Sequence, residues 1–186
     1  MNETKLPMGR KGKVIKYAEL LLCLIFAVTG SFFCQPAEFL LWYVLVFCAY
    51  TDMRTSQVYI FPLRLCIVCE FVMLVVKYGL CSKTYIEIAG CGAVIIFLWL
   101  VRVYARGDME IFLMLVVAAV LRGEGAAGYA FRLMSTSAAL FVGLYSVYFV
   151  IHNMYRKLNG EKIIIIKKAP MVPSIALAFL ICCMYG

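Results

Sequence analysis

Long apolar segments, separated by short polar junctions, occupy most of this 186-residue chain. Seven segments can be delimited, at residues 17–33, 39–50, 58–76, 85–103, 111–121, 126–151 and 169–185. A helix needs about 20 largely apolar residues to cross a bilayer, with a range of about 17–25. Five segments reach that length, and the second and fifth are shorter. The pattern predicts an all-α, polytopic transmembrane helix bundle of six to seven spans.

The balance of residue types supports a lipid environment. Only 15% of the residues are charged and 65% are hydrophobic, whereas about a quarter of a typical soluble domain is charged. So few charges cannot cover a water-facing surface. The length fits one membrane-embedded domain, 1–186, in which 1–36 form a basic tail and an extra first span. The basic flank would also suit a signal peptide, but no clear small-x-small cleavage site follows, so we expect a retained helix.

The formal net charge of +8 is explained better by membrane topology than by nucleic-acid binding, because Lys and Arg gather in cytoplasmic loops. If the N-terminus lies in the cytoplasm, thirteen of the 18 basic residues lie on the cytoplasmic side and three on the outer side, and the other two lie within spans. The inner set is Lys5, Arg10, Lys11, Lys13, Lys16, Arg54, Arg102, Arg106, Arg156, Lys157, Lys162, Lys167 and Lys168; the outer set is Lys77, Lys83 and Arg122. We expect a multi-pass protein of the plasma or inner membrane with its N-terminus in the cytoplasm.

This orientation brings two aspartates to one membrane face. Asp52 follows the second segment and Asp108 precedes the fifth. Ionisable residues at span edges are costly and often functional. Two neighbouring carboxylates share one proton, so one can activate water while the other protonates a scissile carbonyl. Spacing alone does not separate such a pair from two ordinary interfacial aspartates.

The remaining ionisable residues in or near the spans have structural explanations. Glu19 and Glu87 lie near span ends, and Arg64 and Glu70 are expected to pair with partners in the bundle. The nine cysteines lie mostly in apolar runs, where cysteine behaves as a small hydrophobe. Cys66-x-x-Cys69 lacks a second half to complete a zinc site. The sequence predicts neither a metal nor a cofactor.

Three short motifs follow one another from Phe39 onward. Asp52-Met-Arg-Thr-Ser-Gln-Val58 resembles the Asp-x-Arg-x-x-x-Ile-Pro-Asn element of prepilin and preflagellin peptidases. Arg106-Gly-Asp-Met-Glu110 resembles their Gly-x-Gly-Asp-x-Lys element, and Ala169-Pro-Met-Val-Pro-Ser174 their Pro-Phe-x-Pro segment. The chain thus resembles this family of membrane aspartic peptidases, in the small form that lacks the methyltransferase insertion.

The resemblance implies an aspartic endopeptidase that cuts the basic leader from type IV pilin-like precursors at the cytoplasmic membrane face, without N-methylation. Asp52 and Asp108 would be the catalytic pair. Supporting or substrate-binding residues would be Arg54, Gly107, Glu110, Pro170 and Pro173. The partners would be a precursor with a basic leader and an apolar helix, together with membrane lipid, and no nucleic acid.

The chain departs from the family pattern at three places. Ala105 replaces a glycine, which is harmless only where the backbone does not need a positive φ. Glu110 replaces a lysine, and its charge would either raise the pKa of Asp108 or favour a basic leader. Val58-Tyr-Ile60 replaces Ile-Pro-Asn. Lost activity or altered specificity therefore stays open.

The positions of the aspartates in their helices suggest their roles. Asp108 begins a segment and Asp52 ends one. The helix dipole favours an ionised Asp108 and a protonated Asp52, so we expect Asp108 to be the base and Asp52 the acid.

Other functions compete with the peptidase. A non-catalytic homologue could act as a membrane assembly factor. A small transporter could use Asp52, Asp108 and Glu70 as an ion path, although no internal repeat supports it. A presenilin-like peptidase fits the Asp-x-Arg and Pro-x-x-Pro elements less well. The apolar run at 163–166 is expected to be a structural strand or interfacial segment.

Overall fold

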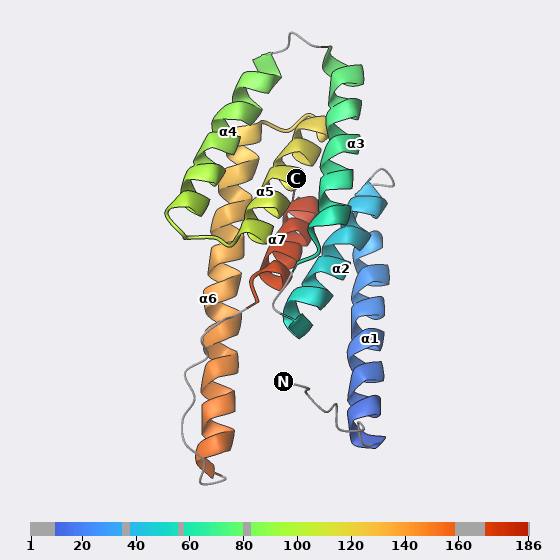
Figure 1. The fold of residues 1–186 in the computed structure, drawn as a ribbon, viewed down its shortest axis with the longest axis vertical. Coiled ribbons are helices and arrows are strands. Elements are labelled where there is room, and N and C mark those ends of the chain that lie inside the picture. The colour runs from blue at the N-terminus through green and yellow to red at the C-terminus, as the bar shows by residue number, and fades with distance from the viewer. Residues whose placement is uncertain (1–9, 35–37, 56–57, 80–82, 159–169, 186) are drawn as a thin grey trace, which may run out of the picture.

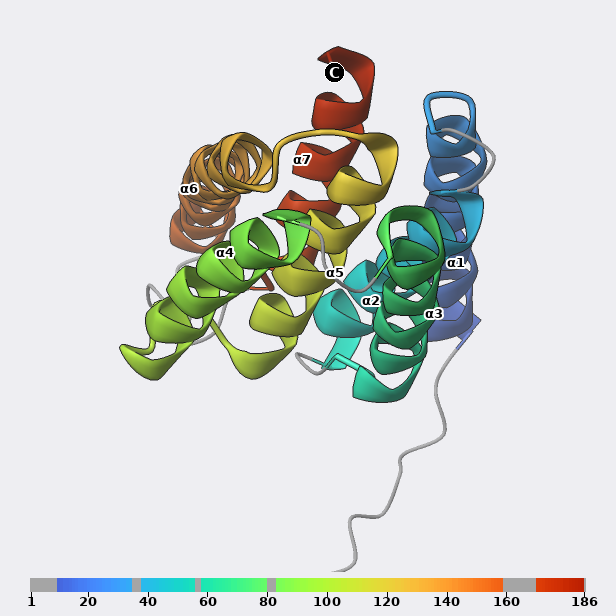
Figure 2. The same ribbon diagram turned by 90° about the horizontal axis from the view of Figure 1, so that it is seen from above.

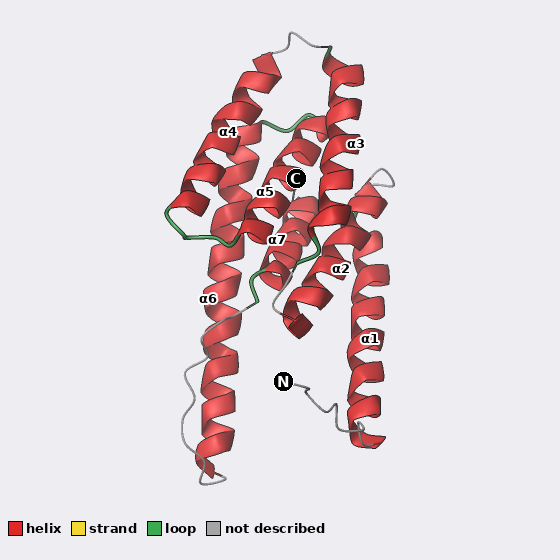
Figure 3. Ribbon diagram, in the orientation of Figure 1, coloured by secondary structure: helices red, strands yellow, loops and turns green. Residues whose placement is uncertain are grey.

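The computed structural model describes residues 10–34, 38–55, 58–79, 83–158 and 170–185, and within these ranges all regular secondary structure is helical (Figure 3). The helices are α1 (Arg10–Ser31), α2 (Phe39–Thr55), α3 (Ile60–Tyr78), α4 (Lys83–Leu100), α5 (Arg106–Arg122), α6 (Ala126–Leu158) and α7 (Val172–Tyr185). Each apolar segment corresponds to one helix, so the predicted all-α fold is confirmed. The segment at 163–166 lies outside the described residues.

Successive helices from α2 to α7 run in alternating directions along the long axis (Figure 1). One end of the bundle therefore collects the C-terminal end of α2 and the N-terminal ends of α3, α5 and α7. We call it the aspartate end, because Asp52 and Asp108 lie there. The opposite end holds the C-terminal ends of α3 and α5 and the N-terminal ends of α4 and α6 (Figure 1).

Helix α5 lies in the interior of the bundle, with α3, α4 and α6 packed against it (Figure 2). Almost every side chain from Asp108 to Val120 is buried. Helix α7 packs between α2 and α6. An interior helix flanked on all sides is apolar around its whole circumference, which explains why the fifth segment shows no amphipathic pattern.

An aromatic contact joins three of the helices. The fully buried ring of Trp42 on α2 stacks on Phe179 of α7, with centroids 6.2 Å apart. Its indole Nε1–H donates a 2.8 Å hydrogen bond to the carbonyl oxygen of Ala27 on α1. A Cβ at Gly30 would overlap the same ring, so glycine there permits α1 to approach α2.

Within the described part of the chain, two helical stretches are long and apolar enough to cross a membrane: Lys83–Leu100, and Ala126–Ile151 within α6. Only 11% and 6% of the residues in their most apolar windows are buried inside the protein, whereas a core helix of a soluble protein is largely buried. Large apolar side chains also cover the outer face of α3, including Phe61, Val68 and Val76. Exposed apolar surface of this extent is typical of contact with lipid.

Candidate functional site

Asp52 lies in the last turn of α2 and is only 8% exposed. Its Oδ2 accepts a 3.1 Å hydrogen bond from the backbone amide of Val172, and Met171 supplies a second backbone hydrogen bond. Both donors lie where α7 begins. The first four amides of a helix have no hydrogen-bond acceptor within that helix. Asp52, which belongs to α2, supplies an acceptor for the start of α7.

The two prolines predicted to shape the last helix flank these donors. Pro170 directly precedes them, and Pro173 occupies the first turn of α7. Proline is tolerated there because its missing N–H would have no partner inside the helix. Together the prolines leave the amides of Met171 and Val172 as the donors that face Asp52.

Asp108 lies in the first turn of α5 and is 7% exposed. Its Oδ2 accepts a 3.2 Å hydrogen bond from the backbone amide of Ala105, the residue that caps the helix. Ala105 has an extended backbone with φ of −73°. Alanine adopts that conformation as readily as glycine, so the Gly-to-Ala departure introduces no backbone strain.

The two carboxyl groups interact electrostatically. Burial raises the pKa of Asp108 to about 6, and repulsion from Asp52 adds to the increase, while the hydrogen bond from Ala105 opposes it. Burial also raises the pKa of Asp52, against the opposing effect of Val172 and Met171. The structure therefore places the two aspartates at the same end of the bundle, close enough for the charge of Asp52 to act on Asp108, although 56 positions separate them.

Gly107 lies against the chain's own loop between α2 and α3. A Cβ at this position would come within 2.9 Å of Val58 Cβ, closer than such atoms approach in folded proteins. The absence of a side chain thus lets the start of α5 pack against residues that follow Asp52. This contact gives Gly107 a structural role between the two motifs.

Glu110 is buried and its charge is balanced by arginines. Its Oε1 lies 3.2 Å from Arg64 Nη2 and 3.4 Å from Arg106 Nε. The increase in the pKa of Asp108 arises from burial and Asp52 rather than from Glu110. The expected pairing of Arg64 within the bundle is confirmed, with Glu110 as its partner.

Arg54 turns toward its own helix. It donates a 2.6 Å hydrogen bond to the hydroxyl of Tyr50 and lies over that ring. Tyr104, which the sequence analysis did not select, lies close enough to Asp108 for that carboxylate to raise its pKa, although burial is the larger cause. The Tyr104 ring packs on Phe112, with centroids 5.0 Å apart. A neutral phenol therefore neighbours the acidic pair.

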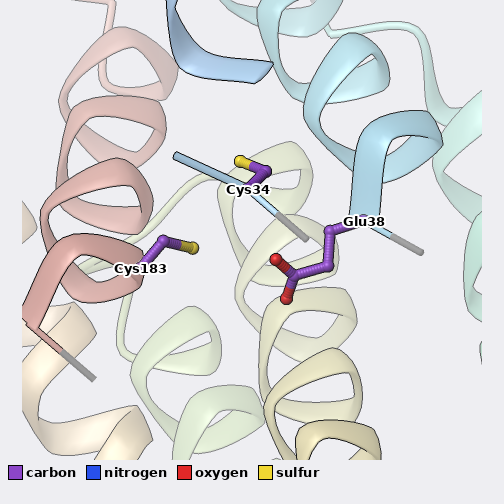
Figure 4. Close-up of side chains that lie close together, drawn as sticks. All are labelled: Cys34, Glu38 and Cys183. Carbon is purple, nitrogen blue, oxygen red and sulfur yellow. The ribbon is translucent and has the colours of Figure 1, made fainter. Parts of the chain in front are cut away.

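The opposite end of the bundle holds a second polar cluster, around Arg122. The ligand atoms of Cys34, Glu38 and Cys183 lie within 4.8 Å of one another (Figure 4). Arg122 forms ion pairs with Glu38 and Glu124 and lies 3.3 Å from Cys183 Sγ. No sequence pattern predicts this cluster, because its members are far apart along the chain. Cys66 and Cys69, by contrast, do not converge: one is buried and the other exposed.

A cavity of about 470 Å³ opens beside this second cluster. Its walls are mainly apolar, and its polar lining residues are Glu38, Glu70, Lys77 and Arg122. The Oε2 atom of Glu70 is buried without a hydrogen-bond partner among the described residues. The cavity is at the far end of α3 and α5 from the aspartates, so it does not belong to the acidic pair.

We found no significant match to this chain among family models, curated proteins or solved structures. The aspartate end holds two buried carboxyl groups, and burial and the charge of Asp52 both raise the pKa of Asp108. Backbone amides face one of them and a phenol lies near the other.

Proposed function

We propose that the chain is a polytopic membrane aspartic endopeptidase of the prepilin-processing kind. Six to seven of its helices would lie in the membrane, with the N-terminus in the cytoplasm. The observation that carries the proposal is the interaction of Asp52 with Asp108, contributed by helices distant in sequence and buried at one end of the bundle. Neighbouring carboxyl groups that repel one another retain one proton between them, the state that aspartic-protease chemistry requires.

The orientation follows from charge. The aspartate end carries Arg54, Arg64, Arg102 and Arg106, whereas the α3–α4 and α5–α6 loops carry few basic residues. Placing the aspartate end in the cytoplasm satisfies the positive-inside rule. Water reaches that boundary, and a peptide can open its backbone hydrogen bonds there at lower cost than in the lipid core.

Hydrolysis would use both acids directly. The ionised carboxylate takes a proton from water as its oxygen attacks the scissile carbonyl carbon, and the protonated carboxyl donates its proton to the carbonyl oxygen. The tetrahedral intermediate then collapses and the C–N bond breaks. The proton held by the base passes to the leaving nitrogen, and one hydroxyl proton of the intermediate returns to the other carboxylate, which restores the singly protonated pair. No group outside the chain is needed beyond water.

The contacts of the two aspartates support a distribution of roles opposite to the one predicted from the sequence. Two backbone hydrogen bonds and the N-terminus of α7 stabilise the negative charge of Asp52, whereas Asp108 receives one such bond. We infer that Asp52 is the base and Asp108 the acid. The earlier assignment considered only the dipole of the helix to which each aspartate belongs. Because the pair titrates as a unit, the roles describe where the shared proton resides most of the time.

The substrate would be a precursor whose short basic leader precedes an apolar helix. Its leader would approach the aspartate end from the cytoplasm, and its helix would lie beside the apolar outer faces of the bundle. Glu110 is paired with two arginines, so it would contribute little attraction for a basic leader. Selectivity would depend instead on the membrane position of the scissile bond.

Co-expression with a type IV pilin-like precursor tests the proposal. We expect the wild-type chain to convert the precursor to a faster-migrating form, and Asp52→Asn or Asp108→Asn to abolish conversion while the protein stays in the membrane. Glu87→Gln, an exposed carboxylate on α4 at the other end of the bundle, is the matched control and should cleave normally. Normal conversion by either Asn variant would refute the catalytic pair. Absence of conversion by all forms would favour the non-catalytic assembly factor.

A further inference from the structure

We propose that Cys34 and Cys183 form a disulfide bond in the mature protein. The proposal rests on the membrane orientation argued above, and it does not depend on peptidase activity. Cys34 follows α1 and Cys183 lies in the last turn of α7. Both belong to the end of the bundle opposite the aspartates, which the orientation places outside the cytoplasm. Disulfides form and persist in such compartments.

The geometry favours bond formation. The two sulfur atoms lie within 4.8 Å of one another, and both side chains point into the space between the α1–α2 junction and α7 (Figure 4). A sulfur–sulfur bond is about 2.05 Å long, so the two sulfur atoms would move closer together as the bond forms. Cys182, the neighbouring cysteine on α7, lies outside this group.

The surroundings of Cys34 make it the nucleophile of the pair. A hydrogen bond with Cys183 lowers the pKa of Cys34; burial and Glu38 act in the opposite direction, and Arg122 lowers it further. The thiolate, rather than the thiol, attacks a disulfide. Cys34 would attack a disulfide-bearing oxidoreductase of the outer compartment to give a mixed disulfide, and Cys183 would then displace that carrier. Two protons and two electrons pass from the cysteines to the carrier, which leaves as a dithiol.

A metal ion is the competing occupant of the same group. Two thiolates and a carboxylate would suit zinc, which usually takes four ligands. However, the guanidinium of Arg122 already pairs with Glu38 and lies 3.3 Å from Cys183 Sγ. A divalent cation would have to displace this positive charge from its carboxylate. The cluster is therefore better suited to a covalent bond between sulfurs than to a cation.

The link would fasten two parts of the bundle that otherwise touch weakly. Helix α1 packs mainly against α2, and the bond would tie its C-terminal junction to α7. The same helix α7 presents the Val172 amide to Asp52 at its other end. The disulfide would thus restrain the helix that positions one of the two carboxyl groups.

Counting thiols in protein from intact cells tests the proposal. Acid quenching followed by a maleimide reagent blocks the free thiols in the cell. The protein is then denatured, and the reactive thiols are counted by mass with and without reduction. We expect two fewer reactive thiols before reduction than after. The difference should vanish in Cys34→Ala and in Cys183→Ala, and it should persist in the matched control Cys182→Ala. Reduction should also lower the unfolding temperature of the wild type by about 5 °C or more, and leave that of Cys34→Ala unchanged.

Equal thiol counts before and after reduction would overturn the disulfide, as would loss of the difference in Cys182→Ala alone. A further variant separates this failure from an error in orientation. Gly125→Cys introduces a thiol in the exposed loop between α5 and α6, where a Cβ meets no other atom within 4 Å. Labelling of this thiol by a membrane-impermeant maleimide on intact cells supports an outer location. Its protection there, with labelling after lysis, would refute the orientation and the disulfide together.

Discussion

The carboxylate of Asp52 accepts a hydrogen bond from the backbone amide of Val172, 3.1 Å away, although 120 positions separate the two residues. The bond joins the C-terminal end of α2 to the N-terminal end of α7. It also places the positive pole of α7 against a buried acid. This contact connects the last motif of the sequence to the first, and it stabilises the ionised form of Asp52.

Removal of the Val172 amide should change the acid–base balance with little change in shape. Val172→Pro deletes the N–H at the first position of α7, where proline is well accommodated, and Val172→Ala retains it. We expect the proline variant to raise the pKa of Asp52, and to move the acidic limb of the cleavage pH profile upward by about one pH unit. The alanine variant should leave that limb unchanged. Equal profiles for both variants would show that the amide does not stabilise the charge.

The raised pKa of Asp108 predicts a pH-dependent stability. Burial holds this pKa near 6 in the folded protein, above the ordinary value of 3.8. Between these values the folded state binds more protons than the unfolded state, so the free energy of unfolding decreases as pH rises through this window. Asp108→Asn removes the cost of burying an ionised carboxylate, and its side chain still accepts the hydrogen bond from Ala105. The free energy of unfolding of this variant should exceed that of the wild type by about 1–3 kcal/mol at pH 8, and the difference should vanish near pH 4.

Thermal unfolding in detergent across this pH range measures the effect. Glu87→Gln, which removes an exposed carboxylate at the other end of the bundle, is the control for the substitution itself. A difference between Asp108→Asn and the wild type that does not change with pH would contradict the raised pKa of Asp108.

Gly107→Ala tests the contact between the two aspartate-containing motifs. The added Cβ would lie 2.9 Å from Val58 Cβ, so we expect a loss of about 1–3 kcal/mol in unfolding free energy and displacement of the start of α5. Val58→Ala in the same chain should restore part of the loss. Gly128→Ala on α6, where a new Cβ meets no atom within 4 Å, should be neutral or slightly stabilising. An equal effect at Gly107 and Gly128 would argue against the close contact.

The contacts of Glu110 explain how the chain accommodates an acidic residue where the second motif of the peptidase family has a lysine. Arg64 and Arg106 both reach its buried carboxylate. Glu110→Lys would place a third cation in that position, and we expect a loss of about 3 kcal/mol in unfolding free energy. Arg64→Glu should recover part of this loss in the double variant, and a double-mutant cycle measures the coupling. A stable Glu110→Lys protein would indicate that the arginines turn to solvent without cost.

Most of the helical structure could be predicted from the sequence. The lengths of the apolar segments predicted each of the helices in the described residues, because every helix carries a continuous apolar stretch that is either buried or exposed to lipid. The prediction for the fourth segment, 85–103, overran α4, which ends at Leu100. The chain turns there through Arg102, whose φ is 62°. No glycine or proline in this stretch signals the turn.

The contacts of the site were harder to predict. Arg106 and Glu110 are one helical turn apart and form a pair that spacing suggests. The Arg64–Glu110 pair and the Asp52–Val172 hydrogen bond join residues 46 and 120 positions apart, and they depend on how helices are placed side by side. The contact between Asp52 and the N-terminal end of α7 was not predicted for that reason. The same long separation concealed the proximity of Cys34 to Cys183.

The central claim is that Asp52 and Asp108 act together in peptide hydrolysis. The most direct measurement is cleavage of a synthetic precursor segment, a basic leader joined to an apolar helix, by purified protein in detergent, read by mass spectrometry in ¹⁸O-labelled water. The account predicts one cut at the leader boundary, with one ¹⁸O atom in the new carboxyl terminus. It also predicts a loss of at least about 1,000-fold in rate for Asp52→Asn and for Asp108→Asn. Cleavage at wild-type rates by either variant, or an intact substrate with properly folded wild-type protein, would contradict the account.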